Sequence, residues 1–155
     1  MTIVHKILKS FEHLSAIESG TRVKTIYGNA FDFNTLIENV ALQEGEVVVL
    51  INRIVTSRMI FSKANLDFAE NADVLLFFLS RTTYDADSKE NEDIIEGCRN
   101  LFVRWMLQFP VDNDDVRPVG EIQMTRVYEK TDTILTGLAV SLQLQEDIGT
   151  SRCNL

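Results

Sequence analysis

Six polar residues between positions 85 and 96 have the spacing of the ligands in a calcium-binding loop: Asp85, Asp87, Lys89, Asn91, Asp93 and Glu96. Carboxylates stand at the first and twelfth positions, where such a loop needs them. The sixth position, which should be glycine for the sharp turn, is Glu90, and a lysine replaces the fifth-position ligand. The segment therefore favours a helix with a capped, acidic start over an ion site.

A second acidic group, residues 112–115, raises the question of a metal pair for phosphoryl transfer. No histidine or further carboxylate pattern accompanies it, so a solvated loop is the better interpretation. His5 and His13 are too far apart on a predicted helix to share one ion, and the chain has no HExxH motif. We expect both histidines at the surface or at the boundary of the core, and we expect no metal and no other cofactor.

Motifs for covalent catalysis and for nucleotide binding are absent from the sequence. It contains no GxSxG, no GxxxxGK[ST] and no GxGxxG. Cys98 and Trp105 both lie in the apolar stripe of a predicted helix, where they are expected to pack in the core. Aromatic residues do not alternate with basic ones, which disfavours binding of single-stranded nucleic acid. The residues therefore predict a protein that is not an enzyme.

The net charge of −8 disfavours nonspecific binding to a phosphate backbone, although it suits a surface past which DNA slides. Cys98 and Cys153 are the only cysteines and have no zinc-site spacing, which favours a reducing compartment. The first 15 residues lack the apolar core of a signal peptide. No apolar run approaches the roughly 20 residues that cross a bilayer. We expect a protein assembled in a cytoplasm.

Apolar spacing predicts two main helices. The first runs from Ile3 to about Leu14 with Thr2 as N-cap, and Gly20 follows its end. The second follows the loop at 81–93 and ends at Pro110. Its apolar stripe comprises Ile94, Ile95, Cys98, Leu101, Phe102, Trp105, Met106 and Phe109. A short helix is also expected between Asn34 and Gly45.

Strands are predicted at 21–28, 47–52, 54–61, 72–80, 120–129 and 134–146, the last two forming a hairpin around residues 130–133. The most apolar stretch, 72–80, is expected to be buried on both faces. This order predicts one α+β domain over residues 1–155, with a short tail at about 148–155. It contains a mainly antiparallel sheet of about five or six strands, with the long helix and the N-terminal helix packed on one face.

The closing strand alternates strictly. Leu138, Val140, Leu142 and Leu144 form one face, and Ala139, Ser141, Gln143 and Gln145 form the other. The second face is small and uncharged, so it could accept a neighbouring copy of the chain. A long terminal hairpin must have its edges paired or covered. The residues leave open whether another subunit does this or whether helices and loops do.

Residues 72–102 combine an apolar strand, an aspartate-containing loop, the pair Glu90–Asn91 and an amphipathic helix. Residues 126–147 form a closing hairpin in which Thr136–Gly137 precedes the alternating apolar residues, with Cys153 nearby. This pattern resembles tail-terminator, tail-completion and connector ring proteins of tailed phages, of the crAss-like type that infects Bacteroides-type bacteria. The resemblance covers about half of the chain, mainly 72–147. The segment 47–61 departs from it, which leaves the particular component open.

The resemblance implies an α+β structural virion protein that forms a homo-oligomeric ring of six or twelve subunits and joins the capsid portal to the tail. Its partners would be other copies of itself and neighbouring connector, portal or tail proteins. DNA would pass nearby without specific binding, no membrane would be involved, and the virion would be assembled in the host cytoplasm. The residues expected at partner contacts are Tyr84, Asp85, Asp87, Glu90, Glu129, Lys130, Asp132, Gln143 and Gln145. The alternatives are a small cytoplasmic adaptor domain and a metal-dependent enzyme such as a nuclease.

Overall fold

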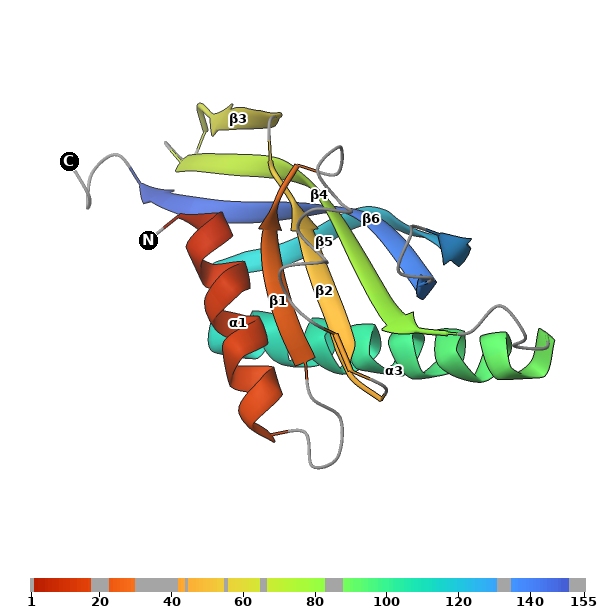
Figure 1. Cartoon of the computed structure of the whole chain (residues 1–155). Coiled ribbons are helices and arrows are strands. Elements are labelled where there is room, and N and C mark those ends of the chain that lie inside the picture. The colour runs from red at the N-terminus through yellow and green to blue at the C-terminus, as the bar shows by residue number, and fades with distance from the viewer. Residues whose placement is uncertain are drawn as a thin grey trace.

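The structure of this 155-residue chain is a computed structural model, which describes residues 2–17, 23–29, 42–43, 45–54, 56–64, 67–82, 88–130 and 135–150. Figure 1 shows the elements in chain order. They are α1 (Ile3–Ile17), β1 (Val23–Gly28), β2 (Val47–Asn52), β3 (Ser57–Ser62), β4 (Asp67–Arg81), α3 (Ser88–Asp112), β5 (Val116–Lys130) and β6 (Leu135–Thr150).

The strands form one six-stranded sheet in the order β1-β2-β4-β6-β5, with β3 paired to β4 beside that path. Only β1 and β2 are parallel, and every other pair is antiparallel. β4 is long enough for two strands to share its side opposite β6. β3 pairs with residues 67–72 and β2 with residues 76–80. The predicted α+β architecture with a mainly antiparallel sheet is confirmed.

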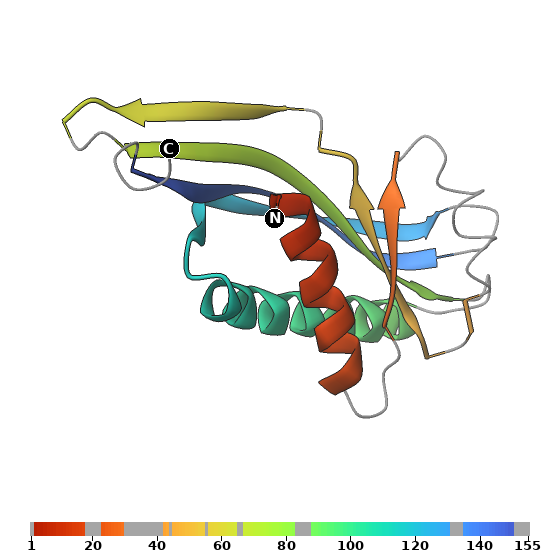
Figure 2. The same cartoon turned by 90° about the vertical axis from the view of Figure 1, so that its left-hand side faces the viewer.

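Both helices pack on the same face of the sheet, as predicted (Figures 1 and 2). An aromatic cluster joins them. The rings of Phe11 in α1 and Trp105 in α3 stack with centroids 4.8 Å apart, and Phe78 of β4 meets Phe11 edge-on at 5.9 Å. The indole Nε1 of Trp105 donates a hydrogen bond to Ser10 Oγ at 2.7 Å. Cys98 and Trp105 are buried in this core, which confirms their predicted packing.

A smaller apolar cluster lies on the opposite face of the sheet. It comprises Ile26, Leu42, Val48, Leu79, Val127 and Leu135. Here β6 approaches β4 so closely that a Cβ atom on Gly137 would lie 1.9 Å from the carbonyl oxygen of Phe78. Only glycine allows this approach, because any other residue would force the two strands apart.

Several predicted boundaries differ from the structure. Pro110 does not end α3, which continues to Asp112. The helix ends instead where the backbone N–H and the side-chain amide of Asn113 both donate to the carbonyl oxygen of Phe109, at 2.9 and 3.1 Å. β5 begins at Val116 and includes Pro118, which an edge strand tolerates because one side of its backbone needs no partner.

β4 begins at Asp67 rather than at 72, because residues 67–71 also pair with β3 and β6. The expectation that 72–80 is buried on both faces is wrong in part. Asp73 is exposed, and Leu75 and Phe77 are only partly buried. β6 continues to Thr150, into the predicted tail. The short helix expected between Asn34 and Gly45 lies almost entirely outside the described residues.

Candidate functional site

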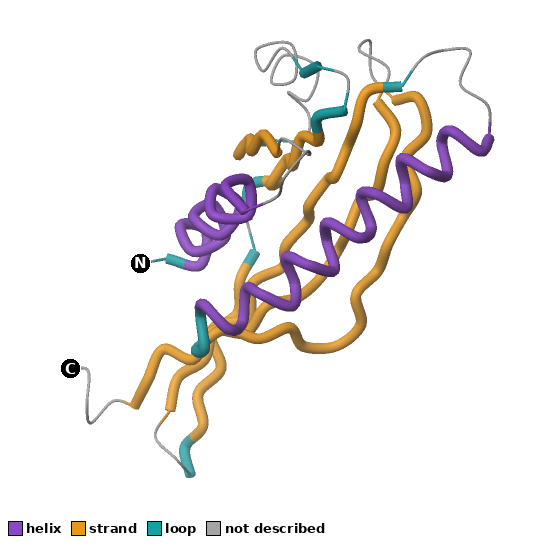
Figure 3. Tube along the Cα trace, turned by 90° about the horizontal axis from the view of Figure 1, so that it is seen from below, coloured by secondary structure: helices purple, strands orange, loops and turns teal. Residues whose placement is uncertain are grey.

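One end of the sheet extends beyond the helices as a projection, which we call the arm (Figures 2 and 3). It consists of β3 (57–62) with residues 67–72 of β4 and 144–150 of β6, and at its base residues 116–118 of β5 pair with residues 144–146. The register pairs Ser57 with Ala72 and Phe61 with Phe68 across the hairpin. The arm therefore continues strands that begin in the core of the domain.

β3 exposes three consecutive large apolar side chains. Met59 is 64% exposed, Ile60 45% and Phe61 49%. Phe61 has one aromatic partner, Phe68, with ring centroids 4.7 Å apart. Among the described strands, β3 pairs only with β4, so its second edge has no described partner. Natural sheets normally protect such an edge with charge, proline or a covering element, so this strand is a candidate binding surface.

The strand period decides which way these side chains point. Met59 and Phe61 share a face with Ser57, which pairs with Ala72, and Ala72 belongs to the core beneath the helices. Met59 and Phe61 therefore lie on the helix side of the sheet, but beyond the part that α1 and α3 cover (Figure 3). Ile60 points to the opposite face. The arm is thus a sheet without its helix layer.

A lysine anchors the base of the arm to the body. Lys6 Nζ of α1 lies 2.6 Å from Asp115 Oδ2 and 2.5 Å from Glu146 Oε2 of β6. Partial burial lowers the pKa of Lys6, but the hydrogen bonds to both carboxylates and their charges outweigh it and leave the pKa above its usual 10.5. The backbone N–H of Asp147 also donates to the carbonyl oxygen of Asp115 at 2.8 Å. These contacts hold the base of the arm at a defined angle.

A second uncovered apolar surface lies on α3, and we call it the α3 stripe: Val103, Leu107 and Val111. These residues are 40%, 71% and 73% exposed. Their four-residue spacing places them along one side of the helix, opposite the buried face of Cys98 and Trp105. Arg99 and Arg104 are exposed on the two flanks of the stripe.

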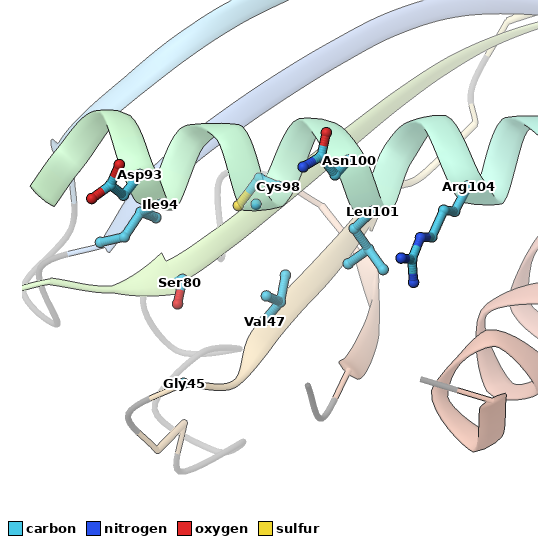
Figure 4. A pocket seen from close by; sticks show the side chains of 10 residues that line it. Gly45, Val47, Ser80, Asp93, Ile94, Cys98, Asn100, Leu101 and Arg104 are labelled. Carbon is cyan, nitrogen blue, oxygen red and sulfur yellow. The ribbon is translucent and has the colours of Figure 1, made fainter. Parts of the chain in front are cut away.

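A pocket of about 290 Å³ lies between α3 and the ends of β2 and β4. Figure 4 shows Asp93, Cys98 and Arg104 spaced along the helix above it. Burial raises the pKa of the Cys98 thiol to about 12, so this sulfur stays protonated near neutral pH and is a poor nucleophile. The described lining includes no histidine that could act as its base.

The predicted contact residues that lie in the described ranges are spread over different parts of the molecule. Glu90 is exposed in the first turn of α3, at the opposite end of the molecule from the arm (Figures 1 and 3). Glu129 and Lys130 are the last two residues of β5. Tyr84, Asp85, Asp87 and Asp132 lie outside the described residues.

Gln143 and Gln145 are partly buried on the sheet face away from the helices, Gln143 next to the arm and Gln145 within it. Gln143 donates to Asp73 Oδ1 at 2.9 Å, and Gln145 accepts a hydrogen bond from Arg117. Both side chains therefore already have polar partners within the chain. On the same face, Ala139 is partly buried and Ser141 is exposed to solvent.

The sequence-based prediction missed the residues of β3 and of the α3 stripe. The run Met59-Ile60-Phe61 carried a signal, because three consecutive apolar residues in a short strand cannot all face one core. Val103, Leu107 and Val111 carried another, because they repeat every four residues outside the predicted core stripe. Both signals indicate apolar surface in excess of what one domain buries.

The chain matches no model of a known protein family, and no curated protein matches it. In the described ranges, no three His, Cys, Asp or Glu side chains gather as they would around a metal ion. None of the described helices is both long and apolar enough to cross a membrane.

Proposed function

We propose that this chain is a structural virion protein of a tailed phage, which forms a homo-oligomeric ring in the head-to-tail connector or in the tail. The observation that carries the proposal is the arm, with Met59, Ile60 and Phe61 exposed on a strand whose outer edge has no described partner. Contiguous apolar surface of this kind marks an interaction site in a folded protein.

A ring needs two different surfaces on each subunit, because every copy binds its neighbour head to tail. The arm and the α3 stripe are two such surfaces. They lie on different elements, and each carries three exposed apolar side chains. A single self-complementary patch would instead support a two-fold dimer, so the presence of two patches favours the ring over a dimeric adaptor.

The resemblance at residues 72–147 supports the phage assignment. This stretch corresponds to most of β4, to α3 and β5, and to most of β6, which form the sheet centre and its main helix layer. The net charge of −8 suits a wall past which DNA moves, because an excess of carboxylates disfavours nonspecific binding to the phosphate backbone. The partners proposed are six or twelve copies of the chain and the portal or tail proteins above and below.

Light scattering after size exclusion, followed by electron microscopy of single particles, tests the proposal. The protein is measured alone and after co-expression with the genes that flank its own. We expect closed rings whose mass is six or twelve times that of the chain. A monomer or a two-fold dimer under every one of these conditions overturns the ring, and a dimer would favour the adaptor alternative.

A further inference from the structure

We infer that the arm of one copy lies over the α3 stripe of the next copy, so that the neighbour's helix extends the helix layer beneath the projecting sheet. The inference rests on the proposed ring and specifies which surfaces meet in it. It also assigns the helix-side face of the arm, with Met59 and Phe61, and the α3 stripe to a single contact. The occupant of the arm is thus a second copy of this chain rather than an unrelated protein.

The arm continues the face of the sheet on which the helices pack. Within the body, the helix-facing side chains of β4, such as Val74 and Phe78, pack against α1 and α3. Met59 and Phe61 continue that same face outward, past the end of α3 (Figure 3). A helix with an apolar side is the element that already packs on this face further along the sheet. The arm therefore offers a place for one more helix.

The α3 stripe and strand β3 match in shape and length. The stripe runs from Val103 to Val111, eight residue steps apart, which is about 12 Å at 1.5 Å per step. The six residues of β3 span about 20 Å, so the stripe fits within the length of the strand. Leu107, at the centre of the stripe, is the side chain that would contact Met59 and Phe61.

The charges beside the two surfaces have opposite signs. Glu70 pairs in register with Met59 and so lies on the same face of the arm. On the other surface, Arg99 and Arg104 flank the stripe. Packing the arm on the stripe brings a carboxylate beside guanidinium groups at the edge of the apolar contact. Such rim charges select the correct partner and its orientation more than they add affinity.

The apolar area of the two surfaces is large enough to form the centre of an interface. The α3 stripe exposes three apolar side chains, and the helix side of the arm exposes Met59 and Phe61. Each surface presents on the order of 200–300 Å² of apolar area, near the lower end of the roughly 300–600 Å² that the largest patch of a typical monomer covers. A standard interface buries about 800 Å² per partner around an apolar centre, so one patch against the other supplies that centre. A contact between two copies of β3 would leave both α3 stripes in water.

Cysteine cross-linking between two differently labelled proteins tests the contact. In a Cys153→Ser background, only the buried Cys98 remains, and two proteins are prepared, one with Met59→Cys and one with Leu107→Cys. They are mixed, allowed to exchange subunits and treated with a short bis-maleimide. We expect a cross-link between the two proteins at least tenfold stronger than within either alone. The double variant should give a ladder of covalent oligomers that ends at the ring.

Ile60→Cys is the matched control, because it lies in the same strand and points to the other face. We expect it to cross-link to Leu107→Cys at least tenfold less than Met59→Cys does. Rings that form without a Met59→Cys to Leu107→Cys cross-link would overturn the contact while leaving the proposed function intact. Met59→Cys that cross-links mainly to itself would show a β3–β3 contact and overturn it as well. A protein that stays monomeric both alone and after co-expression with the flanking genes overturns both proposals.

Charge placed in the contact gives an independent test. Leu107→Asp should weaken assembly at least tenfold, because the contact would bury a carboxylate without a partner. Thr125→Asp places the same charge on exposed β5, on the sheet face away from the helices, and should leave assembly unchanged. Both variants should melt as monomers within a few degrees of the parent chain. Equal assembly of the two variants contradicts the inference.

Discussion

The body of the domain and its arm use the same strands but treat apolar side chains in opposite ways. β4 passes through both. At Val74, Leu76 and Phe78 its helix-facing side chains are almost completely buried, whereas in the arm Phe68 is only partly buried and its ring meets the exposed Phe61 of β3. The difference lies in the second layer, because α1 and α3 cover the body, whereas the outer part of the arm extends past the C-terminal end of α3 (Figures 2 and 3). Alternation along a strand thus predicts that one face is apolar, but it does not predict whether another element of the chain buries that face.

The largest loss of stability is expected when the helix layer loses the side chain at its centre. Trp105→Ala should lower the free energy of unfolding by about 3–5 kcal/mol, because it leaves a large cavity between the stacked Phe11 ring and β4. Urea denaturation monitored by circular dichroism measures this. Leu107→Ala, on the opposite side of the same helix and 71% exposed, should change the monomer by less than about 0.5 kcal/mol. Similar losses in the two variants would contradict the burial described for α3.

The second prediction concerns the close approach of β6 to β4. Gly137→Ala should lower the free energy of unfolding by at least about 1–3 kcal/mol. The new methyl group overlaps the Phe78 carbonyl, so the backbone must move. The matched control is Gly97→Ala, which meets no atom within 4 Å and lies inside α3. That change should stabilise the protein by up to about 1 kcal/mol through helix propensity. Thermal melts of both variants would reveal opposite shifts, and a stabilised Gly137→Ala would refute the close approach.

The third prediction addresses the junction between the body and the arm. Lys6→Met should cost about 1–3 kcal/mol, because it removes two charge-assisted hydrogen bonds and leaves Asp115 and Glu146 without their cation. Hydrogen exchange should speed up at Asp147 and its neighbours, since the base of the arm loses its anchor. Lys9→Met, on the same helix but without either contact, serves as the control. Unchanged exchange at the arm in Lys6→Met would argue against the anchor.

Alkaline titration sharpens this point. Folding raises the pKa of Lys6, so protonated Lys6 stabilises the native state. That contribution is complete below the usual value of 10.5 and is lost as the pH rises through the higher value of the folded chain. The stability difference between the parent chain and Lys6→Met should therefore stay constant from neutral pH to about pH 9 and shrink above 10.5. A difference that already shrinks below about pH 9 would contradict the raised pKa.

The smallest effect on the monomer is expected within the arm itself. Met59→Thr removes a side chain that is 64% exposed and keeps a good strand former, so the free energy of unfolding should change by less than about 0.5 kcal/mol. Denaturant melts measured at a concentration where the chain is monomeric test this. A loss of 2 kcal/mol or more would mean that Met59 belongs to the core of its own chain.

Local pattern was enough for most of the fold. The four-residue and three-residue spacing of α1 and α3 indicated which sides enter the core, and the alternation of β6 indicated its buried face. The candidate binding surface was harder to predict, and the contact residues predicted from the acidic loop and the hairpin tip are not those that form the arm. Exposed apolar residues such as Met59 and Leu107 look like core residues in a sequence, because composition reports their apolarity and not their surroundings.

The sequence by itself determined the two helices, the strand order along the chain, the packing of Trp105 and Cys98, and a mainly antiparallel α+β domain. These features depend on periodicity and on turns, which neighbouring residues specify among themselves. Only the tertiary structure decided that β4 begins at Asp67, that β3 and β2 share one side of it, and that the outer part of the arm extends past the C-terminal end of α3. Those outcomes depend on whether distant elements are long enough to cover one another, and Met59 and Phe61 are exposed for that reason.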